Sequence, residues 1–292
     1  MKYRIKFFAD FASSVELKNT YENICETDKM DNYGVDKDIY ITEHDDYTHA
    51  IIINFSMPEL KNIPKKNVVG LAHEPTIFFI HSINKTYSPS IFFYAVKHIG
   101  KYFMGDRVFI EPFIEHFSYM PYNKPLSYIP IKNKLMSIII SEKNDQWFGY
   151  NYRYKMVDLI LQNNLPIDIY GRGSTKFLSL NNNDNVKGEF IENEPYENYE
   201  FHICIENFAC ERYFSEKIIN PLLTNTIPIY LGCRNIKEYF GDSVIIMTGN
   251  IENDIQLIVY ILNYPEKYRR NIDVDMIKKK VSLLDNLDSI FS

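Results

Sequence analysis

The residues whose types and spacing best suit chemistry lie between positions 206 and 217. Glu206 and Asn207 follow an apolar run typical of a strand, and polar groups at the carboxyl end of a strand meet ligands in α/β proteins. Ser215 is a good N-cap for the next helix, which places Lys217 in its first turn. A cation there opposes the helix dipole unless an anion is bound, and the free backbone N–H groups favour phosphate. The pattern predicts a site for a phosphorylated ligand, with Glu216 placed to accept hydrogen bonds from sugar hydroxyls.

An ordinary structural interpretation of the same residues stays open at this point. Lys217 could be a solvated surface lysine, and Glu206 could be a strand-end carboxylate whose hydrogen bonds are all made within the protein. Taken alone, these residue types do not decide between the two interpretations.

The elements that position these residues alternate between short apolar runs and helical stretches. Strands are predicted at 4–9, 38–42, 50–54, 67–72, 135–141, 167–170, 202–206, 227–231 and 244–247, and helices at 152–163, 215–224 and 252–262. The apolar runs alternate only weakly, as expected of strands covered on both faces. This order predicts mostly parallel sheets, and the proline-punctuated stretch 119–134 divides two units, residues 1–130 and 131–292.

The composition is that of a globular chain with no basic bias. The 292 residues carry a net charge of −6, from 32 Lys+Arg against 38 Asp+Glu, which argues against nucleic acid as a partner. The sequence has no apolar run of about 18 residues, so we expect no membrane anchor. The charged N-terminus does not fit a signal peptide. The four cysteines lack zinc-ligand spacing, so we expect reduced structural thiols and no metal site. These features predict a soluble cytoplasmic protein, in the host cytoplasm if the source is a virus.

One segment of the sequence resembles the signature of a known enzyme family. The pattern E-N-x5-Y-x-S-E-K, followed from Thr226 by T-I-P-I-x-x-G, is similar to that of the α-1,3-fucosyltransferases, glycosyltransferase family 10, of the soluble microbial or viral type. The residues on the pattern are Glu206, Asn207, Tyr213, Ser215, Glu216, Lys217, Pro228 and Gly232. Weaker similarity covers the strand at 137–141, Arg153, the turn at 168–171 and the turn Ala72-His73-Glu74-Pro75.

The resemblance implies a GT-B architecture, in which two Rossmann-like domains face a cleft. Residues 1–130 would form the acceptor-side domain and residues 131–292 the donor-binding domain. It also implies transfer of fucose from GDP-fucose to a glycan hydroxyl, with inversion at the sugar carbon and with no cofactor beyond the donor substrate.

The resemblance also implies roles for single residues. Glu74 would be the catalytic base that takes the proton from the acceptor hydroxyl. Lys217 and Arg153 would meet the charge of the departing diphosphate in place of a metal. The remaining donor-binding residues would be Asn207 and Tyr213, which shape the donor pocket, Ser215 at the helix start, and Glu206 and Glu216, which hold hydroxyls.

Alternative residue roles and departures from the family pattern both leave the assignment open. His73 is an alternative base, Arg172 is a further candidate for binding phosphate, and Arg153 could be an ordinary helix residue. Phe208 stands where the family often has a small hydroxyl residue, and Pro221 should kink or shorten its helix. The exact sugar therefore stays open. The alternatives are the same fold with another nucleotide sugar, or a catalytically silent module that binds nucleotide or sugar.

Overall fold

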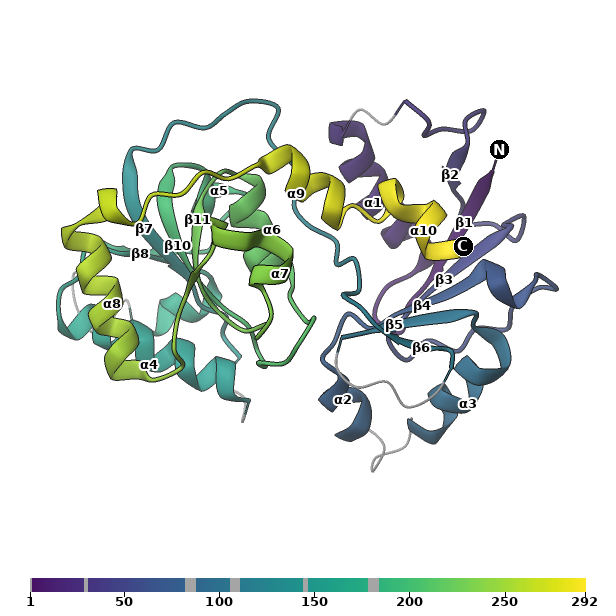
Figure 1. Cartoon of the computed structure of the whole chain (residues 1–292), viewed down its shortest axis with the longest axis horizontal. Helices are drawn as coiled ribbons and strands as arrows, with labels where there is room; N and C mark the ends of the chain where they lie inside the picture. The colour runs from purple at the N-terminus through teal and green to yellow at the C-terminus, as the bar shows by residue number, and fades with distance from the viewer. Residues whose placement is uncertain (1, 29–30, 82–87, 106–110, 144–146, 178–183) are drawn as a thin grey trace. The chain divides into compact units, whose positions relative to one another are not determined.

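The computed structural model describes residues 2–28, 31–81, 88–105, 111–143, 147–177 and 184–292 (Figure 1). Contacts between Cα atoms divide the chain into two compact units. Unit 1 comprises Met1–Lys124, Cys210–Tyr213 and Lys279–Ser292, and unit 2 comprises Pro125–Ala209 and Phe214–Lys278. The predicted boundary between residues 130 and 131 stays a prediction.

Unit 1 is built on a parallel sheet with the strand order β2-β1-β3-β4-β5-β6. Its strands are β1 (Tyr3–Phe8), β2 (Ile39–Ile41), β3 (His49–Ile53), β4 (Val68–Leu71), β5 (Lys101–Met104) and β6 (Phe113–Glu115). Its helices are α1 (Ser14–Asp28), α2 (Thr76–His81), α3 (Ser88–His98) and α10 (Leu287–Phe291), with 3-10 turns at Lys65–Asn67 and Leu284–Asn286. Residues 50–53 are all buried, as predicted for a strand covered on both faces.

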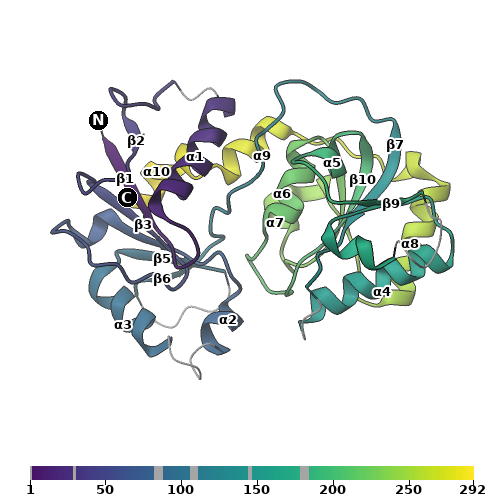
Figure 2. The same cartoon turned by 180° about the vertical axis from the view of Figure 1, so that it is seen from behind.

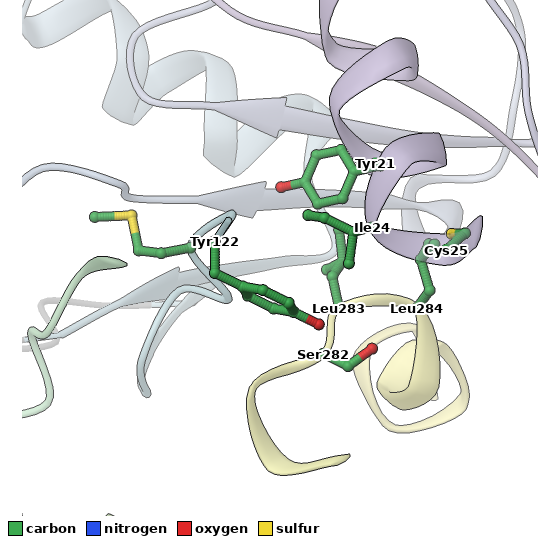
Figure 3. A pocket seen from close by; sticks show the side chains of 8 residues that line it. Tyr21, Ile24, Cys25, Tyr122, Ser282, Leu283 and Leu284 are labelled. Carbon is green, nitrogen blue, oxygen red and sulfur yellow. The ribbon is translucent and has the colours of Figure 1, made fainter. Parts of the chain in front are cut away.

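The C-terminal residues of the chain pack against helix α1 inside unit 1. Figure 3 shows Tyr21 and Ile24 of α1 facing Tyr122, Ser282 and Leu283 across a cavity of only about 10 Å³. A cavity of this size holds about one water molecule. The Tyr21 hydroxyl is buried and has no hydrogen-bond partner among the described residues, so an ordered water there would satisfy it.

Unit 2 contains a second parallel sheet, with the strand order β12-β11-β10-β7-β8-β9. Its strands are β7 (Lys134–Ile139), β8 (Asp168–Tyr170), β9 (Val186–Gly188), β10 (Tyr199–Ile205), β11 (Ile227–Leu231) and β12 (Ile245–Ile246). The chain order reverses direction across the sheet between β7 and β10. In open α/β sheets ligands bind at such a switch point, beyond the carboxyl ends of the strands.

Helices cover both faces of the sheet in unit 2 (Figures 1 and 2). They are α4 (Phe148–Gln162), α5 (Glu194–Glu197), α6 (Glu216–Leu223), α7 (Lys237–Phe240) and α8 (Ile251–Asn263), and α9 (Val274–Val281) follows. Short 3-10 turns lie at Arg172–Phe177, Gly241–Ser243 and Pro265–Lys267. Helices α4 and α8 pack on one another, as do α5 and α6. The prediction of two α/β units with parallel sheets is confirmed.

Candidate functional site

Glu206 links the carboxyl end of β10 to the start of α6. Its side chain has no exposed surface. Its two oxygens accept hydrogen bonds from the backbone N–H of Ser215 at 2.8 Å and from the Ser215 hydroxyl at 2.7 Å. Ser215 is the N-cap of α6 and accepts from the Lys217 N–H, which confirms the predicted cap. Glu206 therefore closes the loop between β10 and α6 and fixes where the helix begins.

Lys217 lies in the first turn of α6 and is paired with carboxylates. Its Nζ donates to Glu216 Oε1 at 2.9 Å and to Ser215 Oγ at 3.2 Å, and lies 3.8 Å from Glu206 Oε2. The sequence predicted that a cation at this position is unfavourable unless an anion is bound, and two carboxylates of the protein already supply negative charge beside it. A bound phosphate would have to take over part of this pairing.

The ionisation of this group of residues follows from burial and mutual attraction. Burial raises the pKa of Glu206, against the opposing effect of Lys217. Burial disfavours the charge of Lys217, but Glu216 and Glu206 outweigh it and raise the pKa of Lys217 above its ordinary value. Burial also opposes ionisation of Glu216, yet the nearby Lys217 lowers the pKa of Glu216 overall. Lys217 is thus a persistent cation at the amino end of α6.

Arg153 adds a second cation to the site from helix α4. Its side chain is buried, its Nε donates to the Gly149 carbonyl at 3.1 Å, and its Nη2 donates to Asn207 Oδ1. The guanidinium lies over the ring of Tyr150, 4.9 Å from the centroid. The charge of Arg153 works against the net rise in the pKa of Lys217 that Glu216 and Glu206 cause, so the two cations repel one another. The structure brings Arg153 to Asn207, as the predicted site requires.

Two glycines let the backbone approach Glu206 and Asn207 closely. A Cβ on Gly149, in the first turn of α4, would lie 1.9 Å from the Glu206 carbonyl oxygen. A Cβ on Gly232, the last residue of the sequence pattern, would lie 2.4 Å from Glu206 Cγ and 2.4 Å from the Tyr230 hydroxyl. Any larger residue at either position must displace Glu206. Gly149 was missed from the sequence, because a spatial contact 57 positions away leaves no local signal.

Glu74 lies in unit 1, in the loop between β4 and α2. This loop is fixed by the Asn54 side chain, whose Oδ1 accepts from the His73 N–H at 2.9 Å. Glu74 is partly exposed, whereas His73 is only 8% exposed. Asp10 follows β1 at the same carboxyl edge of this sheet, and desolvation raises its pKa. The sequence interpretation did not single out Asp10, although a carboxylate directly after a predicted strand is a signal that could have found it.

The predicted site residues fall into two groups in the structure. The contacts above join six of them within unit 2: Arg153, Glu206, Asn207, Ser215, Glu216 and Lys217. Glu74 and the buried Tyr213 belong to unit 1. Arg172 pairs with Glu142 at 3.5 Å. We call the six residues of unit 2 the basic–acidic cluster.

The described residues also bear on metal binding and on membrane insertion. Within the described ranges, no group of three or more His, Cys, Asp or Glu side chains is arranged to hold a metal ion. In the same part of the chain, no helix combines the length and the apolar character needed to cross a bilayer. The four cysteines are buried thiols, as predicted.

Comparison with a solved structure shows what fold the chain shares. A crystal structure of an α1,3-fucosyltransferase with GDP-fucose superposes with a TM-score of 0.53 at 15% identity, over 99% of this chain and 90% of that one. An α-glucosyltransferase in complex with UDP and a 13-mer DNA containing a central A:G mismatch superposes with a TM-score of 0.56 at 11% identity, over all of both chains. These likenesses show the GT-B fold, as predicted.

The sequence is also similar to members of one glycosyltransferase family. Alpha-(1,3)-fucosyltransferase B of Drosophila melanogaster is 32% identical over 112 residues, which are 35% of this chain and 24% of that protein. The aligned region therefore spans about a quarter of this relative. Residues 129–270 match the family model described as glycosyltransferase family 10 (fucosyltransferase), C-terminal part. This span contains the whole basic–acidic cluster, so the cluster lies in the part of the chain that is similar to the C-terminal domain of glycosyltransferase family 10.

Proposed function

We propose that the chain is an inverting fucosyltransferase that moves fucose from GDP-fucose to a glycan hydroxyl. The observation that carries the proposal is the basic–acidic cluster at the carboxyl end of β10, inside the family 10 domain. The GDP-fucose in the structure of a protein with the same fold supports this choice of donor.

The diphosphate of the donor is bound by Lys217 and Arg153, at the positive end of the α6 helix dipole. These groups stabilise the negative charge that develops on the diphosphate as it leaves. When Lys217 turns toward the phosphate, Glu216, whose side chain is 45% exposed, is released to accept hydrogen bonds from hydroxyls of the donor. Asn207 and Tyr213 shape the donor pocket.

Glu206 has a different role from the one the resemblance implies. Both of its oxygens already accept hydrogen bonds from Ser215, and its side chain has no exposed surface. We assign it a positioning role, in which it fixes Ser215 and supplies a counter-charge to Lys217.

The reaction needs a base for the acceptor. The acceptor oxygen attacks the anomeric carbon of fucose, and the bond between that carbon and the phosphate oxygen breaks with its electron pair leaving on GDP. The proton of the acceptor hydroxyl passes to the Glu74 carboxylate. His73 and Asp10 are the alternative bases on unit 1.

Two alternatives differ from this proposal in the donor and in activity. The chain could use another nucleotide sugar, and the UDP complex of the α-glucosyltransferase with the same fold makes uridine donors the first to compare. It could also be a catalytically silent module that binds nucleotide or sugar without transfer.

Turnover assays separate these possibilities. We expect wild type to release GDP from GDP-fucose and to release little UDP from UDP-glucose, with an unchanged rate in EDTA because Lys217 and Arg153 replace a metal. Glu74→Gln should lower the rate about 10²- to 10⁴-fold without weakening GDP-fucose binding, whereas Asp10→Asn, at an alternative base, should leave the rate close to that of wild type. Faster turnover of UDP-glucose, an EDTA effect reversed by Mg²⁺, or an active Glu74→Gln would each contradict part of the proposal.

A further inference from the structure

A second pocket lies in unit 2, outside the basic–acidic cluster. It has a volume of about 370 Å³, which is within the range of small-molecule sites. Residues that follow three neighbouring strands line it: Ile139, Ile140 and Ser141 at β7, Gly171 and Arg172 at β8, and Glu189 and Phe190 at β9. The pocket therefore lies at the carboxyl edge of the sheet, where α/β proteins bind ligands.

Strand register places this pocket next to the cluster. Ile138 of β7 pairs with Ile203 of β10, so Ser141 lies level with Glu206 on the adjacent strand. Tyr170 of β8 pairs with Gly188 of β9, which places Glu189 level with Gly171. Neighbouring strands are about 4.8 Å apart, so the middle of the pocket is roughly 10 Å from the end of β10. This separation suits one nucleoside between the pocket and a phosphate at Lys217.

The side chains around the pocket combine one anion, one cation and one aromatic ring. Glu189 is exposed at the rim. The Arg172 side chain is 67% exposed and 3.5 Å from Glu142. The Phe190 ring is half-buried and meets Tyr170 edge-on at 6.2 Å. The Ser141 hydroxyl is buried and has no hydrogen-bond partner among the described residues.

We propose that this pocket binds the guanine ring of the nucleotide and that Glu189 selects guanine over other bases. The inference rests on the proposed function and specifies its donor. Guanine carries two adjacent donors, N1–H and the 2-amino group, which match the two oxygens of one carboxylate. Its O6 accepts from Arg172, and its face packs against Phe190.

The same groups disfavour the other bases. Uracil presents carbonyl oxygens on both sides of its single N–H, so at least one of them would meet the Glu189 carboxylate and repel it. Adenine has an amino group where guanine has O6. This amino group and the Arg172 guanidinium are both hydrogen-bond donors, so they cannot bond to one another. Each mismatch leaves a charged group without its hydrogen bond, which is costly.

Calorimetric titration of the full chain with GDP, IDP, UDP and ADP tests the proposal. IDP isolates the 2-amino group, because hypoxanthine keeps N1–H and O6 but lacks that amine. We expect wild type to bind GDP about 10-fold more tightly than IDP, and more tightly still than UDP and ADP. Glu189→Gln should weaken GDP binding about 10- to 100-fold and bring GDP and IDP within a few-fold of each other. Glu192→Gln, on the same loop but outside the pocket, is the matched control and should bind like wild type.

Failure of this inference is distinguishable from failure of the proposed function. Equal binding of the four nucleotides by wild type, or unchanged GDP affinity in Glu189→Gln, would overturn the guanine pocket even if GDP-fucose is turned over. Guanine selectivity that depends on Glu189 would support the pocket even if no donor is turned over, in which case only the proposed function fails.

Discussion

Replacing Lys217 by methionine separates the structural role of this residue from its role in binding. In the ligand-free protein the Lys217 Nζ lies 3.8 Å from a carboxylate of Glu206 that has no exposed surface. Two unit charges about 4 Å apart interact by about 4 kcal/mol at an effective dielectric constant of about 20. The Lys217 side chain is 25% exposed. Replacing it also removes the free-energy cost of partly burying the lysine charge, which offsets part of the lost attraction. We therefore expect Lys217→Met to lower the free energy of unfolding by about 2–3 kcal/mol.

A rescue variant shows whether this loss comes from the buried carboxylate. Glutamine at position 206 keeps an acceptor for the Ser215 N–H, and its NH₂ group can donate to the Ser215 oxygen in place of the bond that the hydroxyl now donates, but it carries no charge. The double variant Glu206→Gln/Lys217→Met should therefore regain most of the stability that Lys217→Met loses. Its affinity for GDP should stay about 10- to 100-fold below wild type, because the phosphate still lacks its cation.

Thermal melting and GDP titration of the four proteins in this cycle measure both effects. For a unit of this size, about 2–3 kcal/mol corresponds to a melting temperature roughly 5–10 °C lower. The deficit of Lys217→Met should shrink as pH falls toward 5, because protonation of Glu206, whose pKa burial already raises, removes the unpaired charge. A Lys217→Met protein with the melting temperature of wild type, or one that Glu206→Gln does not stabilise, would show that Lys217 does not offset a buried charge on Glu206.

Three further predictions concern the core of unit 2. Burial lowers the pKa of His202 to about 3, so the free energy of unfolding should fall as pH drops below about 6.5, by up to about 1.4 kcal/mol per pH unit. Urea denaturation at a series of pH values should show a weaker dependence of this free energy on pH in His202→Asn. Lys132 donates to carbonyls of residues 196, 197 and 224, so Lys132→Met should cost about 2–4 kcal/mol in chemical denaturation, and a loss below 0.5 kcal/mol would contradict this. Gly232→Ala should displace Glu206 and weaken GDP binding at least 10-fold by calorimetry, whereas an unchanged affinity would show that the site adapts.

Local signals predicted some elements almost to the residue. The strand at 227–231 begins and ends where the sequence predicted, because its apolar run is bounded by Thr226 and Gly232. Helix α6 begins directly after its serine cap, as predicted. Pro221 lies inside α6 but near its end, so the helix continues for two more residues. Such signals depend on neighbouring residues alone and are visible in one sequence.

Other features arise from contacts that are distant in sequence. Helix α4 begins at Phe148, four residues before its predicted start, although Trp147 at its N-cap position makes no side-chain cap. Its first turn is fixed instead by the Gly149 N–H, which donates to the Asn207 carbonyl. Likewise, the sequence predicted Lys217 as a phosphate ligand, but its pairing with Glu206 depends on how the loop between β10 and α6 folds back. The candidate site could thus be located from the sequence, but not its internal charge balance.

The release of GDP from GDP-fucose by the full chain, followed in the presence and absence of glycan acceptors, shows directly whether the chain is a fucosyltransferase. We expect steady release by wild type, and fucose with the opposite anomeric configuration to the donor in the product. Tight binding of GDP-fucose without any release, across the same acceptors, would contradict it and identify the chain as a silent binding module.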